Sequence, residues 1–90
     1  MRLDQFLVTT RIVKRRTLAQ EYCQAGYVSV NGSVAKSSKD VRVGDELTLR
    51  RTASIDKFRV LKLPASKQVS KTNAVELFEI LASEPTNLAD

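Results

Sequence analysis

The chain has 90 residues, 42% of them hydrophobic, which is enough for one small domain with a short extension but not for two independent cores. It contains no histidine and one cysteine, which excludes histidine acid–base catalysis, histidine metal ligation, an internal disulfide and a cysteine zinc site. No stretch has the apolar length of a signal peptide or a membrane span, so we expect a cytoplasmic protein that does not contact membranes.

The formal net charge of +5 lies entirely in the N-terminal part of the chain. Residues 1–51 hold ten of the 15 basic residues and five of the ten acidic ones, whereas residues 52–90 are balanced. Such an excess is typical of a surface that binds a polyanion, and charge alone leaves RNA, DNA and anionic membranes open. A basic surface that only aids solubility is the alternative.

Two helices are expected first. The apolar stripe of the first helix consists of Leu3, Phe6 and Leu7. Asp4 lies in its first turn, where a carboxylate suits the helix dipole, and Thr9 and Thr10 mark its end.

A second helix is expected to begin between residues 14 and 17 and to end before Gly26. Its predicted core face consists of Leu18, Tyr22 and Ala25. We expect Cys23 to be a half-buried packing residue rather than a reactive thiol.

After the second helix the apolar pattern changes to the alternation that is typical of strands. Asn31-Gly32 predicts a type I′ hairpin turn between the first two strands. The four predicted strands are residues 27–30, 34–35, 46–49 and 58–63.

A last helix is predicted near the C-terminus, after a polar linker at residues 65–72. Asn73 can cap it. Its apolar stripe consists of Ala74, Leu77, Phe78 and Leu81. We expect this stripe to pack on the sheet near Phe58 and Val60, and docking on a partner protein is the alternative. The order of elements gives the fold class α+β, with a domain at residues 1–63 and a linker, C-terminal helix and tail at residues 64–90.

Basic residues gather around the junction of the two predicted N-terminal helices. They are Arg2, Arg11, Lys14, Arg15 and Arg16. On a helix, Arg11 and Arg15 would stack one turn apart. Cations at this spacing repel one another, and a bound polyanion would relieve that repulsion. Arginine binds phosphate through two hydrogen bonds and stacks on unpaired bases, which favours RNA. An exposed basic helix start is the alternative.

A second candidate for phosphate contacts is the loop at residues 31–40, where Lys36 and Lys39 flank small hydroxyl residues. Asp45 and Glu46 follow a turn glycine and are interpreted as turn and strand surface rather than a catalytic pair. The sequence has no P-loop, no Ser–His–Asp set and no metal-ligand cluster, so it predicts neither an enzyme nor a cofactor.

About residues 1–50 contain an ordered pattern: Arg2-Leu3-Asp4-x-x-Leu7, Arg11, Arg15-Arg16-x-x-Ala19, Gly26-x-Val28-x-Val30-Asn31-Gly32, Lys36, Lys39, Val41 and Gly44-Asp45-x-Leu47. In its order and spacing this pattern resembles the S4 RNA-binding domain. Thr10 stands where many members have serine. The resemblance implies an S4-type (αL motif) fold, with two helices packed on a small bent antiparallel sheet. The family's RNA-contacting positions fall on Arg2, Arg11, Lys14, Arg15, Arg16, Thr17, Lys36 and Lys39.

As a free-standing S4 domain, the chain is similar to the bacterial RqcP family and to the fifteen-kilodalton heat-shock S4 family. The resemblance implies a factor that binds stalled large ribosomal subunits with peptidyl-tRNA, contacting large-subunit ribosomal RNA and the tRNA. It further implies support of C-terminal alanine tailing with an RqcH-type partner, and we expect a monomer when free. The alternatives are an RNA-targeting subunit of an RNA-modification enzyme, a heat-shock-type factor that recycles large subunits with nascent chains, and a constitutive ribosomal protein.

Overall fold

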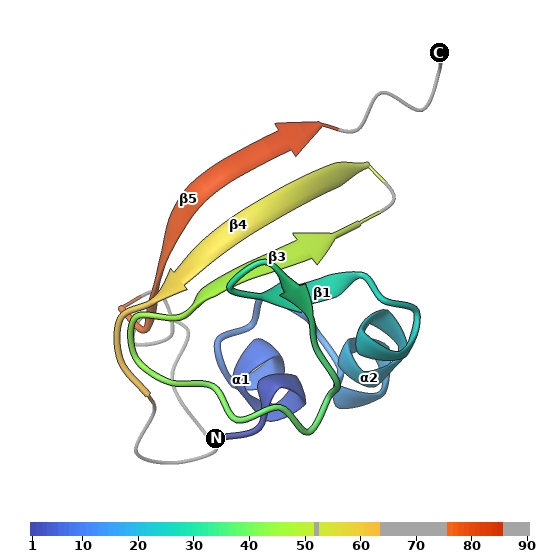
Figure 1. Cartoon of the computed structure of the whole chain (residues 1–90), viewed down its shortest axis with the longest axis horizontal. Coiled ribbons are helices and arrows are strands. Elements are labelled where there is room, and N and C mark those ends of the chain that lie inside the picture. The colour runs from blue at the N-terminus through green and yellow to red at the C-terminus, as the bar shows by residue number, and fades with distance from the viewer. Residues whose placement is uncertain (52, 64–75, 86–90) are drawn as a thin grey trace.

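The computed structural model describes residues 1–51, 53–63 and 76–85, which form two helices and one five-stranded sheet. The helices are α1 (Leu3–Thr9) and α2 (Arg16–Gln24). The strands are β1 (Val28–Val30), β2 (Ser33–Val34), β3 (Glu46–Arg50), β4 (Ser54–Val60) and β5 (Phe78–Pro85). The sheet order is β2-β1-β3-β4-β5, and all neighbours are antiparallel. Both helices lie on the β1 side of the sheet, while β5 lies far from them (Figure 1).

Helix α1 buries the predicted stripe completely, because Leu3, Phe6 and Leu7 all lie in the core between helices and sheet. The helix ends where predicted. The hydroxyl of Thr10 donates a 2.7 Å hydrogen bond to the carbonyl oxygen of Phe6, and Arg11 then takes a left-handed φ of 63°. A side-chain hydroxyl that bonds the last turn, followed by a left-handed residue, turns the chain away from the helix axis.

Helix α2 turns a different face to the core from the predicted one. Ala19 and Cys23 are buried, whereas Leu18 is 36% exposed and Ala25 is exposed. Of the predicted face, only Tyr22 is correct, because it is half-buried and packs against the core, whereas the predictions for Leu18 and Ala25 were wrong. Two small side chains one turn apart instead let the helix backbone approach α1 and the sheet closely.

The end of α2 follows the predicted signal. Gly26 has a φ of 82°, its N–H bonds the Cys23 carbonyl oxygen at 3.1 Å, and the Tyr27 N–H bonds that of Tyr22 at 2.9 Å. This is the Schellman pattern, in which a left-handed glycine lets two orphan carbonyls of the last turn be satisfied. The chain is thereby turned directly into β1.

The predicted hairpin is confirmed. Asn31 and Gly32 have φ values of 52° and 86°, the two left-handed residues of a type I′ turn, and Val30 pairs with Ser33 across it. The four predicted strands all exist, with shifted ends. The largest shift concerns β4, which was predicted at residues 58–63 and lies at Ser54–Val60.

The predicted C-terminal helix is wrong over residues 78–85, which form β5 on the outer side of β4. Residues 73–75 of that prediction and the predicted linker at residues 65–72 lie outside the described residues. The hydrogen-bonding groups on one edge of β4 need partners, and β5 supplies them along its length. The expected packing near Phe58 nevertheless occurs, because the Phe78 ring meets the Phe58 ring edge to face at 5.5 Å between centroids.

The predicted α+β fold class, with two helices packed on an antiparallel sheet, is therefore confirmed apart from that last element. The domain boundary at residue 63 stays a prediction. None of the helices in the described part of the chain is long and apolar enough to cross a membrane.

Candidate nucleic-acid interface

The carboxylate of Asp4 is fully buried at the start of α1. It contacts two of the arginines that are predicted to bind RNA. Arg2 donates to both of its oxygens at 3.2 Å, and the Arg16 Nε lies 3.3 Å from Oδ2. The Gln20 side-chain amide donates to Oδ2 at 3.0 Å and the Gln5 backbone N–H to Oδ1 at 2.8 Å. A single acid thus joins the N-terminal segment to α2.

Burial alone raises the pKa of Asp4, but the hydrogen bonds from Gln20, Arg2, Gln5 and Arg16 together outweigh it and hold the pKa below its ordinary value. The carboxylate is therefore ionised at neutral pH. The side chains of Arg2 and Arg16 are each 48% exposed. Each guanidinium keeps part of its surface in solvent while Asp4 fixes its position and reduces the repulsion between the two cations.

The loop that carries Lys36 and Lys39 lies against the start of α1. The Leu3 N–H donates to the Lys39 carbonyl oxygen at 2.8 Å, and the Asp4 N–H donates to the Ser37 carbonyl oxygen at 3.1 Å. These contacts satisfy the first free N–H groups of the helix. They also place the loop of the second predicted cluster beside the segment that holds Arg2.

The N-terminal amine strengthens the same junction. It lies 2.9 Å from Oδ1 of Asp40, and its hydrogen bond and charge lower the pKa of that exposed carboxyl. The Met1 carbonyl oxygen accepts a 2.8 Å hydrogen bond from the Val41 N–H. The chain start and the segment at residues 36–41 therefore form one continuous surface.

Arg11, Lys14 and Arg15 lie in the loop between the helices rather than on a helix. The predicted stacking of Arg11 on Arg15 one helical turn apart is wrong, because Arg11 is left-handed and α2 begins only at Arg16. The loop is anchored by Ile12 and Val13, which are buried in the core. All three cations lie on the exposed outside of this anchored loop.

All eight predicted positions are exposed, Thr17 among them in the first turn of α2. The structure brings Arg2 and Arg16 together through Asp4, and brings the loop of Lys36 and Lys39 to the same end of the helices. We call these eight residues the basic surface. Their contacts with RNA stay a prediction.

Two further residues of the site, Asp4 and Gln20, were missed by the sequence analysis. Asp4 was interpreted as a partner of the helix dipole and as part of the S4 pattern, with no role in positioning arginines, and Gln20 was given no role. The signal available was an acid placed between arginines in an otherwise basic segment. In the part of the chain that the structure describes, no three His, Cys, Asp or Glu side chains gather as ligands for a metal ion.

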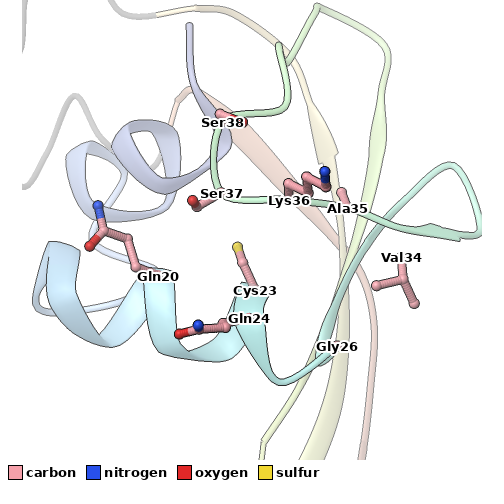
Figure 2. A pocket seen from close by; sticks show the side chains of 9 residues that line it. All are labelled: Gln20, Cys23, Gln24, Gly26, Val34, Ala35, Lys36, Ser37 and Ser38. Carbon is pink, nitrogen blue, oxygen red and sulfur yellow. The ribbon is translucent and has the colours of Figure 1, made fainter.

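A groove of about 720 Å³ lies beside the basic surface, between α2 and the loop after β2 (Figure 2). One wall carries the amides of Gln20 and Gln24, and the other carries Lys36, Ser37 and Ser38. Cys23 points into it from α2, but burial and the nearby charge of Asp4 raise the pKa of its thiol to about 11. The thiol stays protonated and unreactive at neutral pH.

Comparison with known proteins agrees with the geometry. The model of the S4 domain matches residues 1–47. A protein of Halalkalibacterium halodurans named RQC P-site tRNA stabilizing factor is 39% identical over 90 residues, covering both chains completely. A Bacillus subtilis protein of the same name is 43% identical over 84 residues, or 93% of this chain and 95% of that one.

A solved structure, the trimeric heat shock protein 15 of Vibrio cholerae, superposes with a TM-score of 0.82. It is 34% identical and covers 91% of this chain and 82% of that one. The superposition agrees with the arrangement of two helices and an antiparallel sheet described above. The chain belongs to the family of S4-domain proteins.

Proposed function

We propose that this protein is a non-enzymatic RNA-binding factor of ribosome-associated quality control, acting in the cytoplasm on stalled large ribosomal subunits that still hold peptidyl-tRNA. The basic surface contacts large-subunit ribosomal RNA on one side and the tRNA on the other. The tRNA is held in place while an RqcH-type partner supports C-terminal alanine tailing of the nascent chain. The free protein is a monomer.

The observation that carries the proposal is the pair of arginines fixed by Asp4. Arg2 and Arg16 come from separate segments and share one buried carboxylate, and each keeps about half of its side chain in solvent. Guanidinium groups held in place before binding lose less conformational freedom when they meet phosphate. Two relatives are named RQC P-site tRNA stabilizing factor, which supports tRNA as a partner, whereas the geometry alone specifies no kind of RNA.

A rigid clamp of this kind acts by binding and positioning. A tRNA that contacts both ribosomal RNA and this protein dissociates slowly. While one contact is broken, the remaining contacts keep the partners close together, so the broken contact re-forms at a high effective concentration. The contribution of this chain is therefore a longer residence time of the tRNA, with chemistry left to the ribosome and its partners.

The test is the distribution of the protein on a sucrose gradient of lysate in which translation has been stalled. The proposal expects it on free large subunits that carry tRNA, together with the alanine-tailing partner. The double variant Arg2→Ala, Arg16→Ala should leave the large-subunit fractions, whereas Lys57→Ala, which removes an exposed cation from β4, should remain. Equal occupancy of all ribosomes, or a catalytic complex away from ribosomes, would contradict the proposal.

The likeness to heat shock protein 15 favours a second candidate, a factor that recycles large subunits with nascent chains. The two roles differ in the fate of the nascent chain. In a reconstituted reaction with stalled large subunits and the tailing partner, the first role predicts longer alanine tails when the protein is added. Recycling predicts release of the tRNA-linked chain without a change in tail length.

A further inference from the structure

Arg51 lies directly after β3, and its guanidinium connects segments that are distant in sequence. Its Nη2 donates a 2.7 Å hydrogen bond to the carbonyl oxygen of Ile12 in the loop between α1 and α2. Its Nε lies 3.2 Å from Oδ2 of Asp56 on β4, in ion-pair range but outside hydrogen-bond geometry. The Arg51 side chain is 37% exposed and that of Asp56 13%. The cation thus makes its contacts within the fold.

Asp56 is in turn held by hydroxyl groups. Ser83 on β5 donates a 2.6 Å hydrogen bond to Oδ1, and Ser54 donates a 3.3 Å hydrogen bond to Oδ2. A carboxylate with both oxygens engaged has a defined orientation, so it presents a fixed partner to Arg51. The network runs from β5 and β4 through Arg51 to the loop between the helices.

The loop between α1 and α2 contains both buried apolar residues and exposed cations. Ile12 and Val13 are buried, while Arg11, Lys14 and Arg15 point away from the core on the exposed side. Backbone hydrogen bonds of 3.0 Å, from Arg11 to Val8 and from Val13 to Leu7, hold the loop to α1. Arg51 adds a connection from the same loop to the sheet. Its hydrogen bond also gives the carbonyl oxygen of Ile12 a donor.

We propose that Arg51, together with Asp56, is a positioning residue that tethers the α1–α2 loop to the sheet, so that Arg11, Lys14 and Arg15 meet RNA in one fixed arrangement. The inference rests on the proposed RNA-binding function. Arg51 itself touches no RNA. Without the tether the loop cations remain present, but they must be ordered when RNA binds, which lowers affinity.

The tether and simple electrostatics predict opposite results for Asp56→Asn. If charge alone matters, removing an acid strengthens the attraction to phosphate. If Asp56 holds Arg51, the variant loosens the loop, and affinity for purified large ribosomal subunits falls roughly tenfold, as for the weakening of one or two phosphate contacts. Glu46→Gln is the matched control, because Glu46 is an exposed acid at the start of β3. It should bind as well as the natural protein or better.

Arg51→Met and Arg50→Met separate the tether from the charge. Both remove one cation at neighbouring positions, and Arg50 is exposed and has no side-chain hydrogen bond or ion pair among the described residues. We expect a loss of roughly tenfold for Arg51→Met and no more than about threefold for Arg50→Met. Arg51→Lys keeps a donor for Ile12 and a charge for Asp56, so it should recover most of the affinity. Equal losses for the two methionine variants would overturn the proposal.

NMR gives a readout that does not depend on RNA. In folded Asp56→Asn, the amide signals of Val13 and Lys14 should shift or broaden while those of β1 stay in place. Unchanged loop signals, or affinity equal to or above that of the natural protein, would overturn the tether. If the natural protein fails to bind large subunits, the proposed function is wrong, and the loop signals still decide on the tether. Should Arg51→Met not fold, Asp56→Asn and Arg51→Lys give the decision.

Discussion

Arg16 contacts Asp4 across twelve residues of sequence, with its Nε 3.3 Å from the Oδ2 atom that also receives the Gln20 amide. Through this contact the start of α2 is fixed to the start of α1. The arrangement explains why an acid lies in the middle of a basic surface, since one buried negative charge sets the direction of two arginines.

Asp4→Asn should weaken RNA binding although it raises the net positive charge. The amide keeps one acceptor oxygen but places an N–H group where an arginine now donates, so Arg2 and Arg16 lose their fixed positions. The free energy of unfolding should fall by about 1–3 kcal/mol, because a buried network is left partly unsatisfied. Thermal melts and co-sedimentation with large subunits measure both effects. The control is Glu21→Gln, which removes an exposed acid from α2. Tighter RNA binding by Asp4→Asn would contradict the role of Asp4 in positioning Arg2 and Arg16.

The stability of the protein should depend on pH through the same group. The pKa of Asp4 in the folded protein lies below its ordinary value of 3.8, so the ionised carboxylate stabilises the fold above that pH. This contribution is lost as the pH falls through the folded pKa. The difference in free energy of unfolding between the natural protein and Asp4→Asn should therefore be constant near neutral pH and shrink below about pH 3.8. A difference that grows in acid would show that the carboxyl pKa is raised instead.

Binding to large subunits should weaken steeply with salt. If the basic surface contacts phosphates, the logarithm of the association constant falls linearly with the logarithm of salt concentration, by about 0.7–0.9 for each phosphate neutralised. Arg15→Ala should reduce that slope by about 1. Lys57→Ala, on the far strand β4, should leave the slope unchanged. A nearly flat plot for the natural protein would mean that protein contacts, not RNA, recruit it.

Phe78→Ala should lower stability without affecting RNA affinity per folded molecule. The half-buried Phe78 ring packs edge to face on Phe58, so its loss should cost about 1–3 kcal/mol. Ile80→Ala on the same strand is the control, because Ile80 is 63% exposed and its loss should change stability by no more than about 0.5 kcal/mol. Chemical denaturation gives the stability, and titration below the melting temperature gives the affinity. Weaker binding by folded Phe78→Ala would show that β5 takes part in recognition.

The elements that the sequence predicted correctly are those with a local cause. Asn31-Gly32 specifies its turn because glycine and asparagine adopt the left-handed conformation at low cost, and Gly26 ends α2 for a related reason. The C-terminal segment failed for the opposite reason. Leu77, Phe78 and Leu81 have helical spacing, but the edge of β4, some twenty residues earlier, decides their conformation.

The candidate site divides in the same way. The cations are visible in the sequence because charge excess needs no geometry to be recognised. The roles of Asp4 and Arg51 are invisible there, because each depends on which segments the fold brings to within hydrogen-bond distance. In the sequence Arg51 is one more basic residue, and only its contacts with Ile12 and Asp56 distinguish it from its neighbour Arg50.

The hairpin tip has a consequence for the chemical ageing of the protein. Asn-Gly is the dipeptide in which the glycine nitrogen most readily attacks the asparagine side-chain carbon, forming a succinimide and then isoaspartate. In this fold the Asn31 amide is held at both ends, since its Nδ2 donates to Asp45 at 3.1 Å and its Oδ1 accepts from the Glu46 N–H at 3.0 Å. Both bonds must break before the carbon can be attacked. Deamidation at Asn31 therefore runs at the pace of local opening, and isoaspartate accumulating in stored protein records how often this turn comes apart.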